Sequence, residues 1–302
     1  MDKDKTISMI ILAYNNYLYF EKCMDVIFKQ SYPSIELIIA DDHSENFNYE
    51  KIEDYILNNA EKNIVSYKII HNEKNLGIVR NLNNAIKEAS GAFIRLLAMD
   101  DLLYDEDSLK KSVDYLNTHS ELVVLSETLI LDEKDGSKKV TEIYKYQKFF
   151  HETNHYKLYQ IMAQNYIHIH GMCYRKKFFE QYGLFDERFK IIEDVPMLFR
   201  IAKLHCPIGY INTVTAIYRT NSEVSIMNSF KNKNSPIAKE NKQFKEQFLL
   251  PEKKILGFRI YRSVKISYLH NYYLNGKPII FKFIVYLAYA DQILLRIIKK
   301  LR

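Results

Sequence analysis

The stretch FIRLLAMDDLLYDED, residues 93–107, decides the fold because an apolar segment runs directly into acidic residues. Residues 92–101 have the composition of a buried strand, and the adjacent carboxylates of Asp100 and Asp101 stand at its end. Such a pair can hold a divalent cation, and it can equally cap the helix that follows. The segments around this stretch bear on the choice.

Strand-like and helix-like segments alternate through the first half of the chain. Alternation with short links is typical of a parallel sheet that helices cover on both faces. We therefore predict an α/β fold, in which Gly91 ends the third helix. The expected strands are 7–14, 35–42, 65–72, 92–101 and 122–131, and the expected helices are 16–31, 49–62, 77–90 and 107–120.

Polar residues follow three of these strands. In open parallel sheets, ligands bind outside the carboxyl ends of the strands, so we expect these residues at one rim of the sheet. The chain has only 8 glycines and contains neither GxGxxG after its first strand nor GxxxxGK[ST], which excludes a dinucleotide fingerprint and a P-loop. The three polar groups are Tyr14-Asn15, Asp41-Asp42 and Asp100-Asp101.

A second acid pair, Glu193-Asp194, precedes a predicted helix with an apolar stripe. A carboxylate at this place could take a proton from an attacking hydroxyl. The same residues could instead cap the helix that Pro196 begins. The residues alone leave both interpretations open.

His168 and His170 alternate in a segment that we expect to be a strand, so their side chains should share one face. They could line an acceptor pocket, supply a metal ligand, or take an ordinary place in the core or on the surface. Nothing else nearby in the sequence fixes a metal geometry, which favours the core or the surface.

The positive charge of the chain is concentrated near its C-terminus. From residue 221 onward there are 16 Lys and Arg against 5 Asp and Glu, whereas residues 1–220 have 27 against 32. Residues 221–250 read as a linker or a solvated helix, and residues 251–302 as basic, tyrosine-rich helices. The longest apolar run, 283–290, is shorter than the roughly 20 residues that cross a bilayer. These helices could lie on a membrane surface, pack on the rest of the chain or pair in a homodimer.

Cysteine usage and the N-terminus favour the cytoplasm. The three cysteines, Cys23, Cys173 and Cys206, are too few and too scattered for a disulfide framework or a CxxC metal site. Residues 1–16 lack the long apolar region and the cleavage site of a signal peptide. We expect a cytoplasmic protein, peripheral at the inner face of the plasma membrane if its C-terminal helices bind lipid.

Taken together, the motifs resemble an inverting family 2 glycosyltransferase of the GT-A fold. The resemblance covers residues 6 to about 220 and implies a Rossmann-like, mostly parallel sheet flanked by helices, with a C-terminal helical extension. It divides residues 1–220 into a nucleotide-sugar-binding half, 1–101, and an acceptor half, 102–220, followed by the basic helical region 221–302. The motifs are SMIILAYNN (8–16), YPSIELIIADDHS (32–44), NEKNLGIVRNLNNAI (72–86), GAFIRLLAMDDLLY (91–104), and GLFDERF with EDVPM (183–197).

The resemblance also implies roles on the donor side. Tyr14 and Asp42 match the positions that hold the nucleotide base, commonly uridine. Asp100 matches the residue near the ribose, and Asp101 the ligand of Mn²⁺ or Mg²⁺. Arg80 falls near a position that often contacts the donor.

On the acceptor side, Asp194 matches the general base of the family, with Glu193 beside it. The implied function is the metal-dependent, inverting transfer of a hexose from a nucleotide sugar, UDP-linked by the same resemblance, to a hydroxyl. The acceptor would be a saccharide or a lipid-linked saccharide in cell-surface polysaccharide or glycolipid assembly. Leu12-Ala13, His43 and Ala98 depart from the family pattern, and these departures bear on the nucleotide more than on the chemistry.

Three other functions compete with this one. A non-catalytic scaffold that binds nucleotide or sugar and keeps the GT-A fold is the alternative from another class. A nucleotidyltransferase would carry a Gly-rich, basic loop after the first strand, which residues 13–22 lack. We expect no nucleic-acid partner, because no recognised binding module accompanies the basic tail.

Overall fold

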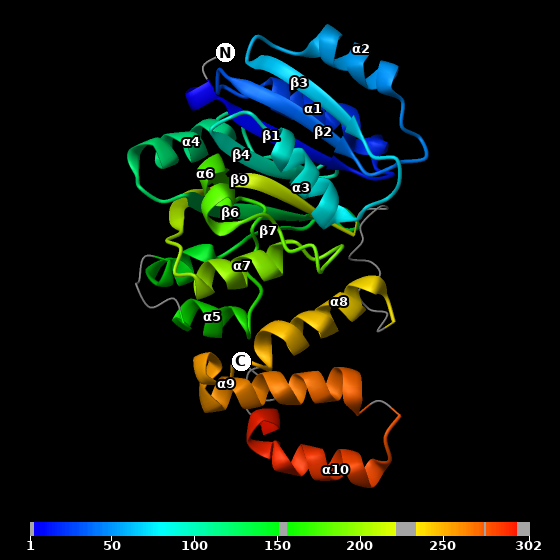
Figure 1. Ribbon diagram of the computed structural model, residues 1–302, viewed down its shortest axis with the longest axis vertical. Helices are drawn as coiled ribbons and strands as arrows, with labels where there is room; N and C mark the ends of the chain where they lie inside the picture. The colour runs from blue at the N-terminus through cyan, green and yellow to red at the C-terminus, as the bar shows by residue number, and fades with distance from the viewer. Residues whose placement is uncertain (1–2, 151–155, 222–233, 275, 295–302) are drawn as a thin grey trace.

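The computed structural model describes residues 3–150, 156–221, 234–274 and 276–294 (Figure 1). Its strands form one sheet in the order β3-β2-β1-β4-β8-β6-β9-β5, and β7 pairs with β6. Strands β1 to β4 are parallel to their neighbours among themselves, whereas β8 is antiparallel to β4 and β6. The strands are β1 Ile7–Ala13, β2 Ile35–Asp41, β3 Ile64–His71, β4 Phe93–Ala98, β5 Leu102–Leu103, β6 Val123–Asp132, β7 Lys138–Val140, β8 Cys173–Arg175 and β9 Gly209–Thr220.

Helices cover both faces of this sheet, which confirms the predicted α/β fold (Figure 1). The α-helices are α1 Phe20–Phe28, α2 Tyr49–Asn59, α3 Ile78–Glu88, α4 Ser108–Thr118, α5 Tyr156–Met162, α6 Lys176–Tyr182, α7 Asp194–Lys203, α8 Pro236–Phe244, α9 Lys253–Tyr268 and α10 Ile279–Ala288. Short 3-10 turns lie at η1 Lys3–Lys5, η2 Tyr17–Tyr19 and η3 Ile143–Phe149, and π-helical turns at η5 Lys245–Leu249 and η6 Leu269–Tyr273.

Two hydrophobic cores enclose the sheet, one on each face. Successive residues of a strand point to opposite faces, so Ile7, Met9 and Ile11 of β1 pack with α1, α2 and α4. Ile10 and Ile38 pack on the other face with α3 and α7. The central strands are therefore fixed on both sides, and so are the loops at their carboxyl ends.

The sheet curls at the point where the chain leaves β4. Residues 99–101 are all that separate β4 from β5, yet β5 pairs with β9, far from β4 in the sheet order. Leu102 lies opposite Ile217 in this antiparallel pairing. The link with Asp100 and Asp101 therefore crosses from one half of the sheet to the other, close to the end of β9.

Gly91 has a different role from the predicted one. Helix α3 ends before it, and Ala89 leaves the helix in an extended conformation. A Cβ atom at Gly91 would lie 2.6 Å from the backbone oxygen of Thr6 and 2.9 Å from the backbone nitrogen of Ser8. Glycine is thus needed for the close approach of two backbones rather than for a helix cap.

The C-terminal region begins with a helix that packs on the sheet domain. Residues 222–233 of the expected linker lie outside the described residues, but a solvated helix is wrong for α8. Its Phe244 is buried, with its ring 5.0 Å from that of Phe199 in α7. Helices α9 and α10 follow, and α10 lies at the end of the molecule opposite α2 (Figure 1). No helix in the described part of the chain is long and apolar enough to cross a membrane.

Candidate active site

Asp100 and Asp101 lie where the sheet curls, beside the end of β9. Asp101 is buried, and its Oδ1 accepts a 2.9 Å hydrogen bond from the backbone N–H of Arg219. Asp100 is half-buried and accepts a hydrogen bond from the Asn16 side chain. Burial, together with the negative charge of Asp100, raises the pKa of Asp101 well above its ordinary range. The two carboxylates thus concentrate negative charge in a place that water solvates poorly.

This donor set fits Mg²⁺ or Mn²⁺. Hard cations of this kind take oxygen ligands, and Mg²⁺ is commonly held by one or two carboxylates with water and substrate phosphates in its remaining positions. Among the described residues, no cluster of three or more His, Cys, Asp and Glu side chains could hold a metal. A cation held by these two carboxylates would take its remaining ligands from water and from a phosphate.

Two consecutive residues of β9, Tyr218 and Arg219, complete this region. The pKa of Tyr218 rises to about 12, first through burial and then through the negative charges of Asp101, Asp100 and the Glu193-Asp194 pair. Arg219 is buried, and its charge opposes the rise in the pKa of Asp101. Sequence reasoning does not single out either residue, because only the pairing of β5 with β9 brings them to the acids.

Asp42 holds the loop that follows β3. Its Oδ1 accepts hydrogen bonds from the backbone N–H of Leu76 at 2.8 Å and from Asn72 Nδ2 at 3.0 Å. Its Oδ2 accepts one from the backbone N–H of Gly77 at 2.8 Å. A carboxylate offers about four lone-pair sites, and among the described residues one site on Oδ2 has no donor.

Asp41, the other acid of that pair, has a structural role that the sequence does not reveal. Its side chain is fully buried at the end of β2. It accepts hydrogen bonds from the Tyr17 hydroxyl at 3.2 Å and the Ser44 backbone N–H at 2.9 Å, and it lies 2.7 Å from His71 Nδ1. It therefore ties together the loops after β1, β2 and β3.

Tyr14 and Arg80 lie at the periphery of this region. Tyr14 is exposed at the end of β1, where its backbone N–H donates to the Asn16 side chain at 3.1 Å. Asn15 has a positive φ of 51°, so the chain turns sharply here. The Nε atom of Arg80 on α3 lies 3.4 Å from a carboxylate oxygen of Glu187, in an exposed ion pair. Arg80 thus links α3 to the loop that leads into α7.

The Glu193-Asp194 pair begins α7. Asp194 accepts hydrogen bonds from the Val195 backbone N–H at 2.7 Å and from the Tyr166 hydroxyl, whereas the Glu193 side chain makes no capping hydrogen bond within the described chain. Burial and the charge of Asp194 raise the pKa of Glu193 strongly. Burial also raises the pKa of Asp194, but the bonds from Tyr166 and Val195 oppose that rise. Glu193 therefore holds its proton more readily than Asp194 does.

His168 and His170 lie in an irregular segment, so the expected strand at this place is wrong. Their rings are 5.8 Å apart, and His170 stacks on Tyr218 with ring centroids 4.0 Å apart. Burial lowers the pKa of His170 to about 3 and also lowers that of His168. Both Nδ1 atoms are buried without a hydrogen-bond partner in the described part of the chain. Tyr218 thus has a neutral imidazole on one side and four carboxylates within electrostatic reach.

A cavity of about 210 Å³ is connected to the second acid pair through one residue. Tyr166 lines the cavity and also donates to Asp194, although neither acid of the pair is among the lining residues. The other lining residues are Ile130, Lys139, Thr141, Glu142, Ile143, Lys145, Tyr146, Ile167 and His168.

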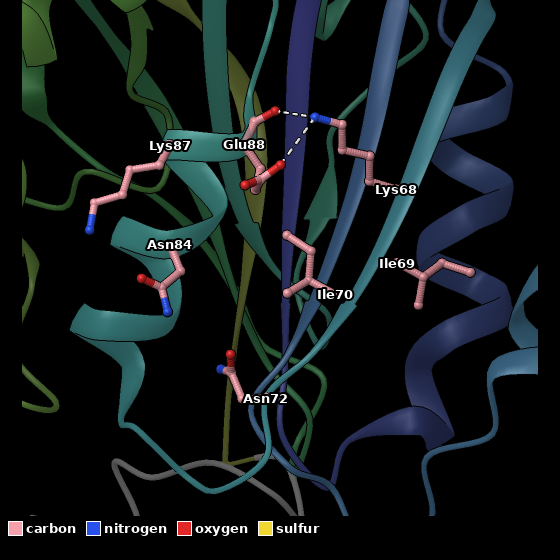
Figure 2. Close-up of a pocket in the computed structure, with 7 residues that line it drawn as sticks. All are labelled: Lys68, Ile69, Ile70, Asn72, Asn84, Lys87 and Glu88. Carbon is pink, nitrogen blue, oxygen red and sulfur yellow. Dashed lines mark hydrogen bonds and ion pairs between the residues drawn. The ribbon is translucent and has the colours of Figure 1, made fainter.

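A larger groove, of about 550 Å³, lies between β3 and α3 (Figure 2). Lys68 spans it, since its Nζ donates to the backbone oxygen of Glu88 and lies 3.5 Å from the carboxylate of that residue. Asn72, at one end of the groove, is bonded to Asp42. The acid pairs do not line this groove, so it is separate from the region around Tyr218.

Comparison with known proteins identifies the fold and the family. The chain is 24% identical over 300 residues to an uncharacterised glycosyltransferase of Haemophilus influenzae, covering 96% of this chain and 88% of that protein. It is 26% identical over 131 residues to glycosyltransferase GlyG of Streptococcus pneumoniae, covering 43% and 42%.

Two solved structures are similar. S. aureus TarS in complex with UDP-GlcNAc has a TM-score of 0.58 at 16% identity, with 88% of this chain and 81% of that one covered. Mannosyltransferase PcManGT from Pyrobaculum calidifontis, in complex with GDP-Man and Mn²⁺, has a TM-score of 0.55 at 14% identity, with 96% and 80% covered. These similarities confirm the GT-A fold and its helical C-terminal region.

The family model described as glycosyl transferase family 2 matches residues 8–183, more than half of the chain and the part that contains both the sheet rim and Asp100-Asp101. The chain belongs to glycosyl transferase family 2.

Proposed function

We propose that this glycosyltransferase transfers a hexose from a UDP-linked sugar to a hydroxyl acceptor, in one displacement that inverts the anomeric configuration. The observation that carries the proposal is the convergence of two acid pairs on Tyr218. One pair suits a cation and a diphosphate, and the other contains Asp194, a carboxylate that can accept a proton. Transfer from a donor bound at the first pair to an acceptor bound at the second needs both a site for the diphosphate and a group that accepts the proton of the acceptor hydroxyl.

Asp194 is the proposed general base. Hydrogen bonds from Tyr166 and Val195 favour its ionised form, and Tyr166 also lines the 210 Å³ cavity. An acceptor hydroxyl bound there would give its proton to Asp194 while the hydroxyl oxygen attacks the anomeric carbon. The bond from that carbon to the diphosphate breaks as the new glycosidic bond forms. Glu193, which holds its proton, keeps a second negative charge away from the base.

Asp100 and Asp101 define the donor side of the proposal. Asp101, with Asp100 toward the ribose, would hold Mn²⁺ or Mg²⁺, whose charge offsets that of the diphosphate leaving group. Tyr14 and Asp42 would contact the base. Arg80, on the helix that follows the loop bonded to Asp42, would contact the donor. TarS with UDP-GlcNAc and PcManGT with GDP-Man and Mn²⁺ support a nucleotide sugar and a divalent cation.

The proposed acceptor is a saccharide or a lipid-linked saccharide, in the assembly of a cell-surface polysaccharide or glycolipid. It would bind in the cavity beside Asp194, where His168 and Tyr166 offer neutral faces for a sugar ring. We propose that residues 1–220 form the catalytic domain, with donor-binding residues in 1–101 and acceptor-binding residues in 102–220. Residues 221–302 would then be a basic, tyrosine-rich helical region that packs on this domain through α8.

Calorimetric titration with UDP, GDP and other nucleoside diphosphates, with and without Mn²⁺, tests the donor site. We expect Mn²⁺-dependent binding that Asp101→Ala abolishes. Asp114→Ala, which removes an exposed carboxylate from α4, is the matched control and should bind like the wild type. Binding that survives Asp101→Ala would contradict the cation assignment.

A second variant separates binding from chemistry. Asp194→Asn should bind the same nucleotide with unchanged affinity and lose turnover by about 10²–10⁴-fold, the range that a general base contributes. Near-normal turnover in Asp194→Asn would overturn the base assignment. Nucleotide binding by the wild type with neither transfer nor hydrolysis of any nucleotide sugar would favour a non-catalytic scaffold.

A further inference from the structure

Helix α10 presents a stripe of large apolar side chains to solvent. Ile280, Phe283, Ile284 and Leu287 follow one another at helical spacing, and we call them the outward stripe. Ile280 is 75% exposed and Leu287 is 67% exposed. Contiguous exposed apolar side chains on a folded protein mark a surface that contacts another phase or another molecule.

The outward stripe faces solvent because polar contacts hold the opposite face of α10 against α9. Arg262 of α9 donates to the backbone oxygen of Ala288 at 2.8 Å and to the carboxylate of Asp291 at 2.6 Å. The Tyr286 hydroxyl lies 2.9 Å from His270 Nδ1. Polar contacts therefore hold the half-buried side of α10 against the rest of the chain. The apolar side of the helix is exposed to solvent.

The surroundings of the outward stripe are basic. Residues 253–294 contain seven Lys and Arg but only one acid, Asp291, which already pairs with Arg262. Lys277 precedes the helix and is exposed, as are Lys253 and Lys254 at the start of α9. The sequence from 295 to 302, outside the described residues, adds four more Lys and Arg and no acid.

An anionic bilayer surface fits these features better than a second copy of the chain. Two copies that met through the outward stripe would bring two basic surfaces together, whereas acidic headgroups would neutralise one such surface. Ten residues of helix are about 15 Å long, half of the roughly 30 Å hydrocarbon core, so α10 is too short to span it. Its length and composition suit a helix that lies in the headgroup region.

We propose that the outward stripe of α10 inserts into the headgroup region of an anionic lipid bilayer, with the lysines around it on acidic headgroups. This surface is separate from the region around Tyr218, and the proposal does not depend on the reaction catalysed there.

Cosedimentation of the full-length protein with vesicles tests the proposal. The wild type should bind vesicles of phosphatidylcholine with phosphatidylglycerol, bind vesicles of phosphatidylcholine alone at least tenfold more weakly, and lose affinity at high salt because screening weakens the headgroup contacts. Leu287→Asp should lower the affinity for anionic vesicles about tenfold or more, since burial of one large apolar side chain is worth about that factor.

The matched control is Leu57→Asp. The exposed fraction of Leu57 is 65%, nearly the same as that of Leu287. Leu57, however, lies on α2 at the other end of the molecule. This variant should bind vesicles like the wild type. Equal vesicle affinities of Leu287→Asp and Leu57→Asp would overturn the proposal. Equal affinities of the wild type for vesicles with and without phosphatidylglycerol would also overturn it. A dimer in solution that Leu287→Asp dissociates would show instead that the outward stripe joins two copies. Nucleotide binding by Leu287→Asp confirms its folding and is read independently of the vesicle result.

Discussion

The hydrogen bond from the Tyr166 hydroxyl to Asp194 favours the ionised form of the proposed base. This bond and those from the backbone oppose the effect of burial on the pKa of Asp194, and the bond from Tyr166 is the largest of these contributions. Glu193 next door receives no comparable support, and its pKa rises strongly. The phenol and one backbone N–H thus favour the ionised form of one of two adjacent carboxyl groups over that of the other.

Tyr166→Phe should therefore move the pH profile of turnover. Without the phenol the pKa of Asp194 rises, and because the base acts only when ionised, the acidic limb of the kcat profile should shift to higher pH. A hydrogen bond to a charged group is worth about 1.5–3 kcal/mol, which corresponds to a shift of about 1–2 pH units. The control is Tyr104→Phe, which changes an exposed tyrosine directly after β5. This variant should leave the acidic limb of the kcat profile at the same pH. An unmoved limb in Tyr166→Phe would contradict the role of Tyr166.

At the scale of elements, α8 connects the C-terminal region to the loop that leads into the second acid pair. The Glu240 carboxylate on α8 accepts hydrogen bonds from the backbone N–H groups of Lys190, Ile191 and Ile192 at 2.8, 2.9 and 3.1 Å. Those residues immediately precede Glu193. The position of the proposed base thus depends on a helix outside the segment that the family model matches.

Glu240→Gln should loosen that loop, because an amide can accept hydrogen bonds only through its single oxygen. A small displacement of a catalytic group costs up to about 100-fold in rate, so we expect kcat to fall about 10–100-fold with a smaller change in the donor KM. Glu246→Gln, in the π-helical turn directly after α8, is the matched control. Steady-state kinetics of both variants test this coupling, and equal kcat values would argue against it.

The elements near the sheet rim could be predicted from the sequence because their signals are local. An apolar run that ends in acid, as at Asp42 and Asp101, shows both a strand and its polar end within ten residues. Tyr218 and Arg219 could not be found in this way, because nothing in residues 209–220 indicates that β9 returns to pair with β5. The expected strand at His168 was wrong because alternation over a few residues also occurs in irregular segments.

At the scale of the whole molecule, one buried carboxylate joins segments far apart in the chain. Glu36 on β2 accepts a 2.5 Å bond from the Ser8 hydroxyl of β1, and bonds of 2.7 and 2.8 Å from the backbone N–H and hydroxyl of Ser90. Burial alone would raise the pKa of Glu36, but these bonds outweigh it, and the pKa falls below its ordinary value. The ionised form therefore stabilises the fold.

The sign of the pH dependence follows from that shift. A carboxyl group whose pKa is lower in the folded chain stabilises it above the unfolded pKa of about 4.3, and the contribution disappears as pH falls through the folded value. Glu36→Gln should lower the free energy of unfolding by about 1–3 kcal/mol at pH 7, with the difference from the wild type shrinking at lower pH. Urea unfolding at pH 7 and below pH 4 measures the difference in unfolding free energy and its change with pH. The control is Glu50→Gln, which changes an exposed residue of α2. A difference that is constant with pH would contradict this role.

Attachment through the outward stripe of α10 would confine the enzyme and a lipid-borne acceptor to the same two-dimensional surface. A protein held at a surface searches by lateral diffusion, so its encounter rate depends on molecules per unit area rather than on concentration in a volume. Attachment through one end of the molecule also restricts its tumbling, and each collision then begins from a narrow range of orientations. On this view, the ten residues of α10 would act on the reaction without any contact with the sugar.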